Sequence, residues 1–115
     1  MPPTTTYKRG DVVLVSFPFT DLTATKQRPA LVVSPDSVNR AQDVILAAIT
    51  SHLTEDEHNI ALAETDFLHG KLPKKSGVRL TKMFTMHSML IRKKIGALKP
   101  AKMDEVLSRM RKIFT

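Results

Sequence analysis

The sequence contains an arginine directly before a proline, and this arginine is a candidate functional residue. Arg28 precedes Pro29 in the stretch KQRPALVVS. A proline disfavours a helical backbone in the residue before it, so Arg28 should be held extended where a strand begins. A guanidinium fixed in this way suits bidentate binding of a phosphate. An ion pair with a nearby acid, such as Asp11 or Asp21, would explain the same residue equally well.

A second group of polar residues ends the strand predicted over residues 43–50. This strand closes with AAITSH, which places Thr50, Ser51 and His52 at its rim. Thr50 could donate its hydroxyl to a phosphate oxygen while Arg28 neutralises the charge, or Thr50 and Ser51 could simply close a turn. Of the four histidines, His52 is the best placed to act as a general base. No histidine pair has a spacing such as HxxxH, so we predict no metal site.

The segment VRLTKMFTMH (78–87) alternates between apolar and polar residues and predicts a half-buried strand. Strict alternation places Arg79 on the more polar face and Lys82 on the opposite face. Arg79 is therefore a second candidate phosphate ligand. The basic cluster at residues 92–94 is less specific, since such a cluster adds only counterion-release affinity for a nucleic acid.

The net charge of +7 is divided unevenly along the chain. Residues 1–70 carry 5 Lys/Arg against 9 Asp/Glu, and residues 71–115 carry 13 against 2. This asymmetry favours a polyanionic or acidic partner, although a solvated basic face would look the same. The chain has no cysteine, which excludes thiolate chemistry and fits a reducing, cytoplasmic location. We find no signal peptide and no apolar segment long enough to span a membrane.

The element pattern predicts one domain over residues 1–115, with residues 1–6 frayed. Strand-like segments occupy residues 11–17, 29–34, 43–50, 60–63, 78–87 and 91–98. Residues 18–28 and 64–77 are expected to be loops, the second with a single turn at 65–68. Residues 100–115 predict a helix with an apolar stripe over 103–114. Together these elements predict a mainly β fold, a small and partly open β-barrel capped by the C-terminal helix.

Four segments carry a resemblance to a known family. RGDVVLVSF, QRPALVVS, ILAAITS and VRLTKMFTMHSMLIRKKIGAL, in this order, resemble the MazF/PemK family of type II toxin–antitoxin endoribonuclease toxins. The resemblance implies an SH3-like barrel and a homodimer. It also implies metal-independent cleavage of single-stranded RNA without a cofactor, leaving a 2′,3′-cyclic phosphate and a 5′-hydroxyl. An acidic antitoxin protein would inhibit the toxin by covering its RNA groove.

The resemblance also implies roles for individual residues. Arg28 matches the catalytic arginine before proline, Thr50 the catalytic threonine, and Arg79 an arginine that some PemK-like members use in catalysis. Apart from the resemblance, we expect four further residues to bind RNA: Lys26, Ser51, His52 and Lys82. An arginine is a poor base because its pKa exceeds about 12. Three candidates for the general base therefore stay open: His52, a neighbouring carboxylate, and Arg28 in an unusual protonation state.

A different function on the same fold is the alternative. A CcdB-like toxin poisons DNA gyrase by protein contact without cleaving RNA, and a regulator on this barrel would only bind nucleic acid. Arg28 and Thr50 would be needed for cleavage and dispensable for a toxin that acts by protein contact alone.

Overall fold

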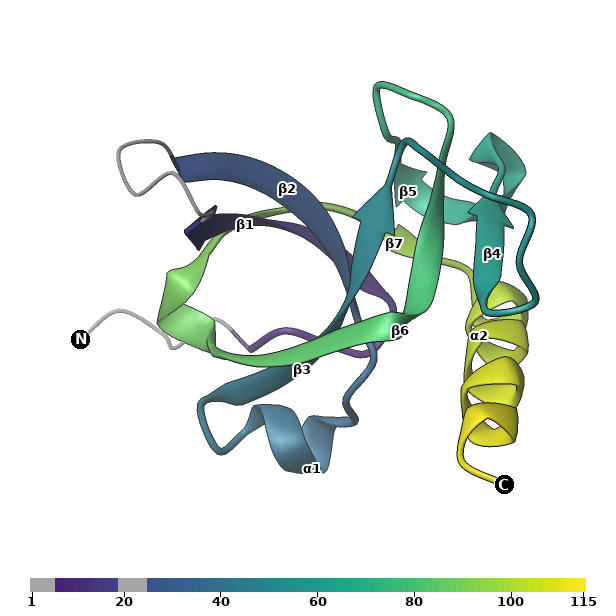
Figure 1. Ribbon diagram of the computed structural model, residues 1–115. Coiled ribbons are helices and arrows are strands. Elements are labelled where there is room, and N and C mark those ends of the chain that lie inside the picture. The colour runs from purple at the N-terminus through teal and green to yellow at the C-terminus, as the bar shows by residue number, and fades with distance from the viewer. Residues whose placement is uncertain (1–5, 19–24) are drawn as a thin grey trace.

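A curled antiparallel sheet of seven strands forms the body of the protein, and a helix at the C-terminal end stands beside it (Figure 1). The computed structural model describes residues 6–18 and 25–115, without the side chains of residues 17, 18, 25 and 26. The strands are β1 (Asp11–Pro18), β2 (Thr25–Val32), β3 (Asp43–Thr50), β4 (Asn59–Leu62), β5 (Phe67–Gly70), β6 (Ser76–His87) and β7 (Ile91–Leu98). The helices are α1 (Asp36–Asn39), the 3₁₀ helices η1 (Glu64–Asp66) and η2 (Ser88–Leu90), and α2 (Pro100–Ile113).

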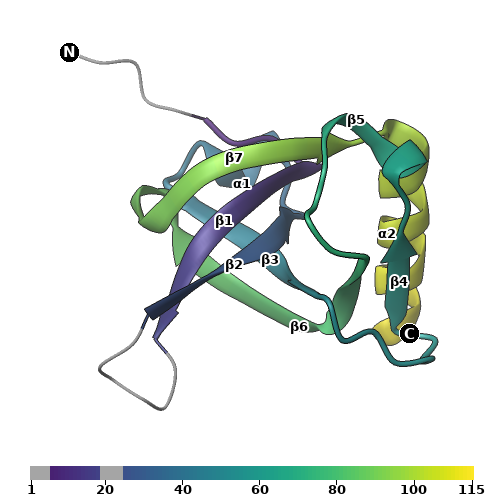
Figure 2. The same cartoon turned by 90° about the horizontal axis from the view of Figure 1, so that it is seen from above.

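The strand order in the sheet is β4-β6-β3-β2-β1-β7-β5, so the two short strands of four residues, β4 and β5, lie at its ends. All six neighbouring pairs are antiparallel. Seen from above, the long strands cross around a common interior while α2 runs along β4 (Figure 2). This arrangement confirms the predicted mainly β, partly open barrel with a C-terminal helix.

Two of the predicted boundaries are wrong. The loop expected over residues 18–28 is shorter, because β2 already begins at Thr25 and pairs there with Pro18 of β1. The loop expected over 64–77 contains β5, which pairs with β7. Gly70 of β5 lies opposite Gly96 of β7, and a glycine inside a short strand is easily taken for a turn residue. The expected frayed residues 1–5 lie outside the described part of the chain.

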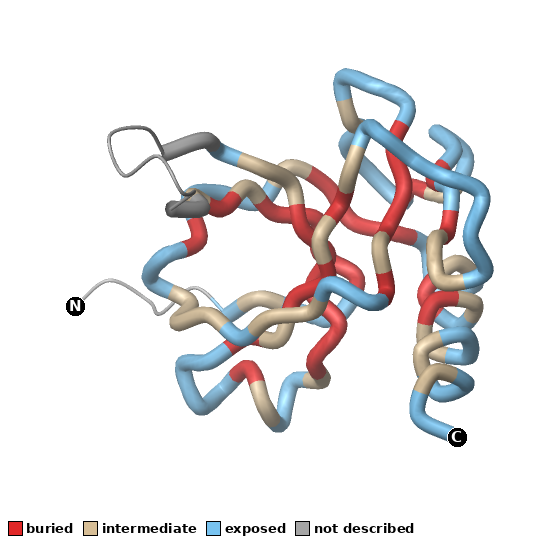
Figure 3. Tube along the Cα trace, in the orientation of Figure 1, coloured by how far each residue is buried: buried red, intermediate tan, exposed pale blue. Residues whose placement is uncertain are grey.

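Buried apolar side chains form two clusters on the two faces of the sheet. Val12 and Leu31 point to one face, and their neighbours Val13 and Ala30 point to the other, as the two-residue period of a strand requires. The first cluster includes Val106 of α2, and Figure 3 shows buried residues where α2 meets the sheet. Each fully buried aliphatic side chain stabilises the fold by roughly 1.5–3 kcal/mol.

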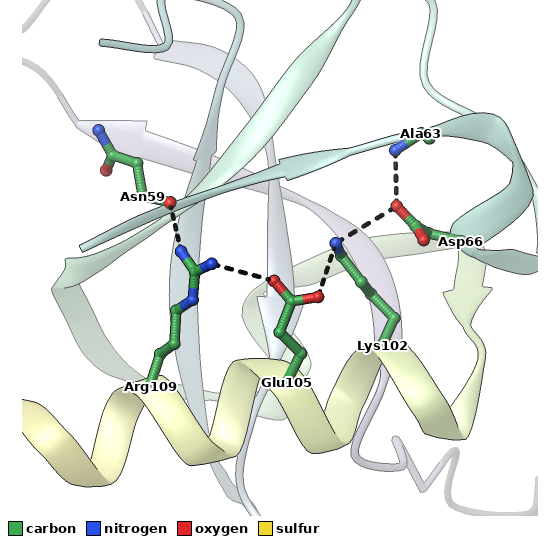
Figure 4. Close-up of polar contacts among 6 residues, drawn as sticks. All are labelled: Asn59, Ala63, Asp66, Lys102, Glu105 and Arg109. Atoms are coloured by element: carbon green, nitrogen blue, oxygen red, sulfur yellow. Dashed lines mark hydrogen bonds and ion pairs between the residues drawn. The ribbon is translucent and has the colours of Figure 1, made fainter. Parts of the chain in front are cut away.

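Polar contacts fasten α2 to the end of the sheet (Figure 4). The Lys102 ammonium lies 3.5 Å from Asp66 of η1 and 3.2 Å from Glu105. Arg109 donates a hydrogen bond of 3.3 Å to the backbone oxygen of Asn59, the first residue of β4. These contacts join α2 to the segment that precedes β5 as well as to β4.

The predicted apolar stripe of α2 is only partly correct. Met103 and Val106 are buried, as a core-facing stripe requires. Phe114, predicted to belong to the stripe, is 72% exposed because α2 ends at Ile113 and Phe114 lies beyond its last turn.

Candidate functional site

The candidate site lies where β2 and β3 part. These strands pair over Val32, Leu31 and Ala30, and their register ends with Ala30 opposite Ala48. The preceding residue, Pro29, has no N–H to donate to a sheet, and prolines are found where such pairing stops. Beyond this point β2 continues beside β1, with Arg28 opposite Val15. The end of β3 continues beside β6, so a gap opens between β2 and β3.

An irregularity in the pairing of β3 with β6 brings two cations to this gap. Ala48 lies opposite Arg79, but its neighbour Ala47 lies opposite Met83, so β6 contains additional residues at this point. A β-bulge of this kind breaks the alternation of faces along a strand. The prediction that Arg79 and Lys82 face opposite ways is therefore wrong. Both residues line one pocket.

We name this pocket the catalytic pocket after the roles predicted for its residues, and its volume is about 540 Å³. It contains three residues predicted to be catalytic and one predicted to bind RNA. Its described lining is Arg28, Pro29, Ala48, Ile49, Thr50, Arg79, Lys82, Met83 and Phe84. Arg28 and Arg79 are half-buried, and Lys82 is exposed. The pocket thus gathers three cations and a hydroxyl over an apolar floor, a combination suited to an anionic ligand with an apolar part.

The hydroxyl of Thr50 is oriented by the loop that follows β3. Its Oγ1 accepts a hydrogen bond of 3.0 Å from the backbone N–H of His52. A threonine hydroxyl has one proton to donate and two lone pairs to accept. The contact with His52 occupies one lone pair and leaves the O–H proton for a ligand. The turn-closing role and the phosphate-binding role considered for Thr50 are therefore compatible.

The other predicted RNA-binding residues lie apart from these four. Ser51 points into an adjacent hollow that shares Arg28 with the catalytic pocket. His52 is exposed on the loop after β3 and is not among the described residues that line the catalytic pocket. Lys26 belongs to β2, but its side chain lies outside the described part of the structure.

The carboxylate of Asp11, one proposed partner of Arg28, is buried at the start of β1. It lies 3.1 Å from the Lys94 ammonium and accepts a hydrogen bond of 2.9 Å from the backbone of Lys8. Burial, and secondarily this carboxylate, raises the pKa of the Tyr7 phenol above its usual value of 10.0. Asp21, the other proposed partner, lies outside the described residues.

Two residues beside Arg28 were missed by the sequence analysis. Gln27 and Lys74 line the hollow that adjoins the catalytic pocket. Lys74 belongs to the run KLPKK between Gly70 and Gly77, and three lysines in five residues were a signal that could have been used.

The described residues offer neither a metal-binding cluster nor a membrane-spanning helix. Among residues 6–18 and 25–115, no cluster of three or more His, Asp or Glu side chains is placed to hold a metal ion. Within the same residues, no helix has the length and apolar character needed to cross a membrane.

The sequence matches the model of a protein family over residues 8–114, almost its whole length. That family is described as the PemK-like, MazF-like toxins of type II toxin–antitoxin systems. The chain belongs to this family. Comparison with curated protein sequences gave no match. The predicted membership of the MazF/PemK toxin family is confirmed.

Solved structures of MazF-like toxins share the fold. An endoribonuclease in complex with its cognate antitoxin from a mycobacterial species has 19% sequence identity and a TM-score of 0.77, over 94% of each chain. MazE–MazF from Deinococcus radiodurans has 17% identity and a TM-score of 0.78, over 96% of this chain and 97% of that one. The Mycobacterium tuberculosis toxin MazF-mt6 has 16% identity and a TM-score of 0.71, over 90% and 95%. The SH3-like barrel of MazF-like toxins is thus the fold of this protein.

Proposed function

We propose that this MazF-like toxin is a metal-independent endoribonuclease that cleaves single-stranded RNA in the catalytic pocket. The observation that carries the proposal is the convergence of Arg28, Thr50, Arg79 and Lys82 on one pocket at the gap between β2 and β3. The endoribonucleases among the solved structures that share the fold support the same reaction. Family membership favours it over the gyrase-poisoning or purely nucleic-acid-binding alternative.

The chemistry follows from what RNA supplies. The 2′-oxygen of a ribose attacks the adjacent phosphorus, and the bond from phosphorus to the 5′-oxygen of the next nucleotide breaks. A base removes the proton of the 2′-hydroxyl, and an acid protonates the leaving 5′-oxygen. The products are a 2′,3′-cyclic phosphate and a 5′-hydroxyl, and DNA is not a substrate because it lacks the attacking hydroxyl.

Arg28 and Thr50 would stabilise the negative charge that builds on the phosphate oxygens. Fixed donors aimed at developing charge supply one of the largest contributions to catalysis. Arg28 is suited to this because its backbone is held by pairing with β1 and by Pro29. Arg79 would share this role, and Lys82, Lys26, Ser51 and His52 would hold the flanking RNA. His52, a nearby carboxylate and Arg28 itself are the candidates for the base.

The direct test is incubation of the purified protein with single-stranded RNA in excess EDTA. We expect cleavage with 2′,3′-cyclic phosphate ends, detected by mass spectrometry of the fragments. Arg28→Ala should lower the cleavage rate by at least about 10²-fold, because it removes a fixed donor to the developing charge. Its circular dichroism spectrum and melting temperature should match those of the wild type. An intact substrate at high protein concentration would reject the nuclease, and an unfolded Arg28→Ala variant would show that Arg28 is structural.

We further propose an acidic antitoxin protein as the partner that inhibits the toxin, and a homodimer as its working form. The MazE–MazF and mycobacterial toxin–antitoxin structures support an antitoxin partner for this chain. The three cations of the catalytic pocket are a suitable surface for acidic side chains, which would then compete with RNA phosphates for Arg28 and Arg79.

A further inference from the structure

Two further hollows extend the catalytic pocket along the surface. The second pocket, of about 440 Å³, shares Arg28, Pro29 and Ile49 with the catalytic pocket. The third, of about 330 Å³, shares Leu72 and its two following residues with the second. The three hollows therefore adjoin one another in a row from Arg28 to residues 71–75, the loop between β5 and β6.

The second pocket has the lining expected of a site for a flat, partly polar ring. Most of its residues are apolar, and the amide of Gln27 and the hydroxyl of Ser51 are among the few polar groups. Small-molecule sites combine an apolar lining with a few such groups and have volumes of about 300–1,000 Å³. Proteins that read single-stranded RNA bind its splayed bases by hydrogen bonds to their edges. The second pocket meets these requirements next to Arg28.

The 71–75 loop adds positive charge beyond this pocket. Lys71, Lys74 and Lys75 are exposed, and Lys74 lines both the second and the third pocket. None of the three forms an ion pair with another residue of the described chain. Glu64 is the single acid among the described residues that line these two pockets. Three exposed lysines without acidic partners are more suited to binding a phosphate backbone than to a structural role.

The loop is held in place on both sides. The Ser76 hydroxyl donates a hydrogen bond of 2.8 Å to the backbone oxygen of Lys74, and Ser76 is itself buried. Leu72 packs against the buried cluster that includes α2. Before the loop, Gly70 lies against Gly96 of β7. A loop anchored in this way loses little freedom when it binds, which favours affinity.

We propose that the second pocket and the 71–75 loop form a subsite for the RNA strand beside the cleaved bond. The second pocket takes the neighbouring base, and Lys71, Lys74 and Lys75 bind the phosphates that follow it. This inference rests on RNA being the substrate, as proposed above, but it concerns binding and not the cleavage step.

The test compares two triple variants with the same net charge. Lys71→Gln/Lys74→Gln/Lys75→Gln removes the proposed phosphate contacts. Lys99→Gln/Arg111→Gln/Lys112→Gln removes three exposed cations from α2 and the residue before it, and serves as the control. The probe is a fluorescein-labelled twelve-nucleotide single-stranded RNA that is fully 2′-O-methylated, so it cannot be cleaved. Fluorescence anisotropy gives its Kd at several salt concentrations, and melting temperatures show that both variants are folded.

We expect the loop variant to raise the Kd about tenfold or more, and to reduce the slope of log K against log salt by about 0.7 for each phosphate that the loop no longer binds. The control variant lowers only the long-range electrostatic attraction between the protein and the RNA. Because salt screens this attraction, the Kd of the control should rise by less than about threefold at 0.15 M salt. Equal effects of the two variants would overturn the inference. So would a loop variant that loses affinity for a twelve-residue poly-Glu peptide but keeps its affinity for RNA, since the loop would then serve a protein partner.

Failure of the nuclease proposal gives a different result. If the protein binds the methylated RNA through the loop lysines but leaves unmodified RNA intact, the subsite is supported and the nuclease proposal is rejected. If it cleaves RNA and its Kd does not depend on these lysines, the nuclease proposal is supported and the subsite is rejected.

Discussion

Arg28 lies at the junction of two pockets because of its neighbour in the sequence. Pro29 stands one residue beyond the last pair between β2 and β3, where a missing N–H does not interrupt their ladder. The proline therefore allows β2 to leave β3 and at the same time holds the arginine extended. Arg28 reaches the catalytic pocket on one side and the second pocket on the other. The same residue can thus bind a phosphate while the adjoining base lies beside it.

Two substitutions of Thr50 distinguish the contribution of its hydroxyl group from that of its side-chain volume. Thr50→Ser keeps the oxygen that accepts the His52 N–H and should retain most of the activity. Thr50→Val keeps the volume but loses the donor to the phosphate, so we expect the rate constant to fall by roughly 10²-fold. Single-turnover cleavage of RNA measures both. Equal activity of the valine variant and the wild type would show that Thr50 has no part in the reaction.

The sequence allowed Arg28 and Thr50 to be selected because each stands at the end of a recognisable strand, and Arg79 because it lies on the polar face of one. The position of Lys82 was predicted wrongly. Its face depends on the bulge opposite Ala47 and Ala48. In VRLTKMFTMH the alternation of polar and apolar residues breaks at Lys82 and Met83, a signal of this bulge that was not used. Gln27 was missed because the hollow beside it is built from distant segments.

At the scale of elements, β5 is held against β7 by a close approach of two backbones. Gly70 has a φ of +77°, which L side chains rarely adopt. A methyl group added there would fall on the carbonyl oxygen of Ile95 and the Cα of Gly96. Gly10 also has a positive φ, of +98°, but the nearest atom to its added methyl would be the Met103 side chain at 3.3 Å.

Gly70→Ala should therefore destabilise the protein more than Gly10→Ala. Both substitutions force alanine into an unfavourable backbone conformation, which costs about 1–3 kcal/mol. At Gly70 a clash with rigid backbone adds to this cost, whereas at Gly10 the flexible Met103 side chain can move away from the added methyl group. Urea unfolding monitored by circular dichroism gives the free energy of unfolding of each variant. Equal losses would mean that β5 can separate from β7 without a large cost.

Elements with continuous apolar sequences were predictable, and those defined by contacts were not. DVILAAIT matches the bounds of β3 because its composition alone favours a strand. IRKKIGAL matches the bounds of β7 although it contains three cations and a glycine. FLHG was not predicted to be a strand, because this segment of β5 is short and its conformation depends on pairing with β7. The beginning of β2 was missed because Thr25 and Gln27 are polar, and pairing with β1 determines their conformation.

At the scale of the whole molecule, part of the positive charge of residues 71–115 lies along the proposed RNA path. Arg79 and Lys82 line the catalytic pocket, and Lys71, Lys74 and Lys75 follow on the adjoining loop. Attraction of a polyanion to such a path increases the rate of encounter and weakens with salt. Five of the thirteen lysines and arginines of residues 71–115 thus lie along this path.

An acidic peptide should inhibit cleavage by competing for this path. We expect a twelve-residue poly-Glu peptide to raise the apparent KM for single-stranded RNA without changing kcat, because both ligands need the same cations. The inhibition should weaken as salt rises from about 0.05 to 0.5 M, where the Debye length becomes shorter. Steady-state cleavage at several peptide concentrations measures the effect. A lower kcat at unchanged KM would place the acidic partner elsewhere on the protein.

The sheet ends in β4 and β5, which have four residues each. Exposed edge strands can recruit strands of other molecules, and short ones offer few free backbone groups for this. At β4, the Asn59 carbonyl is already bound by Arg109. The protein should consequently remain dispersed at high concentration, with little tendency to polymerise edge to edge, even when no inhibitor covers it.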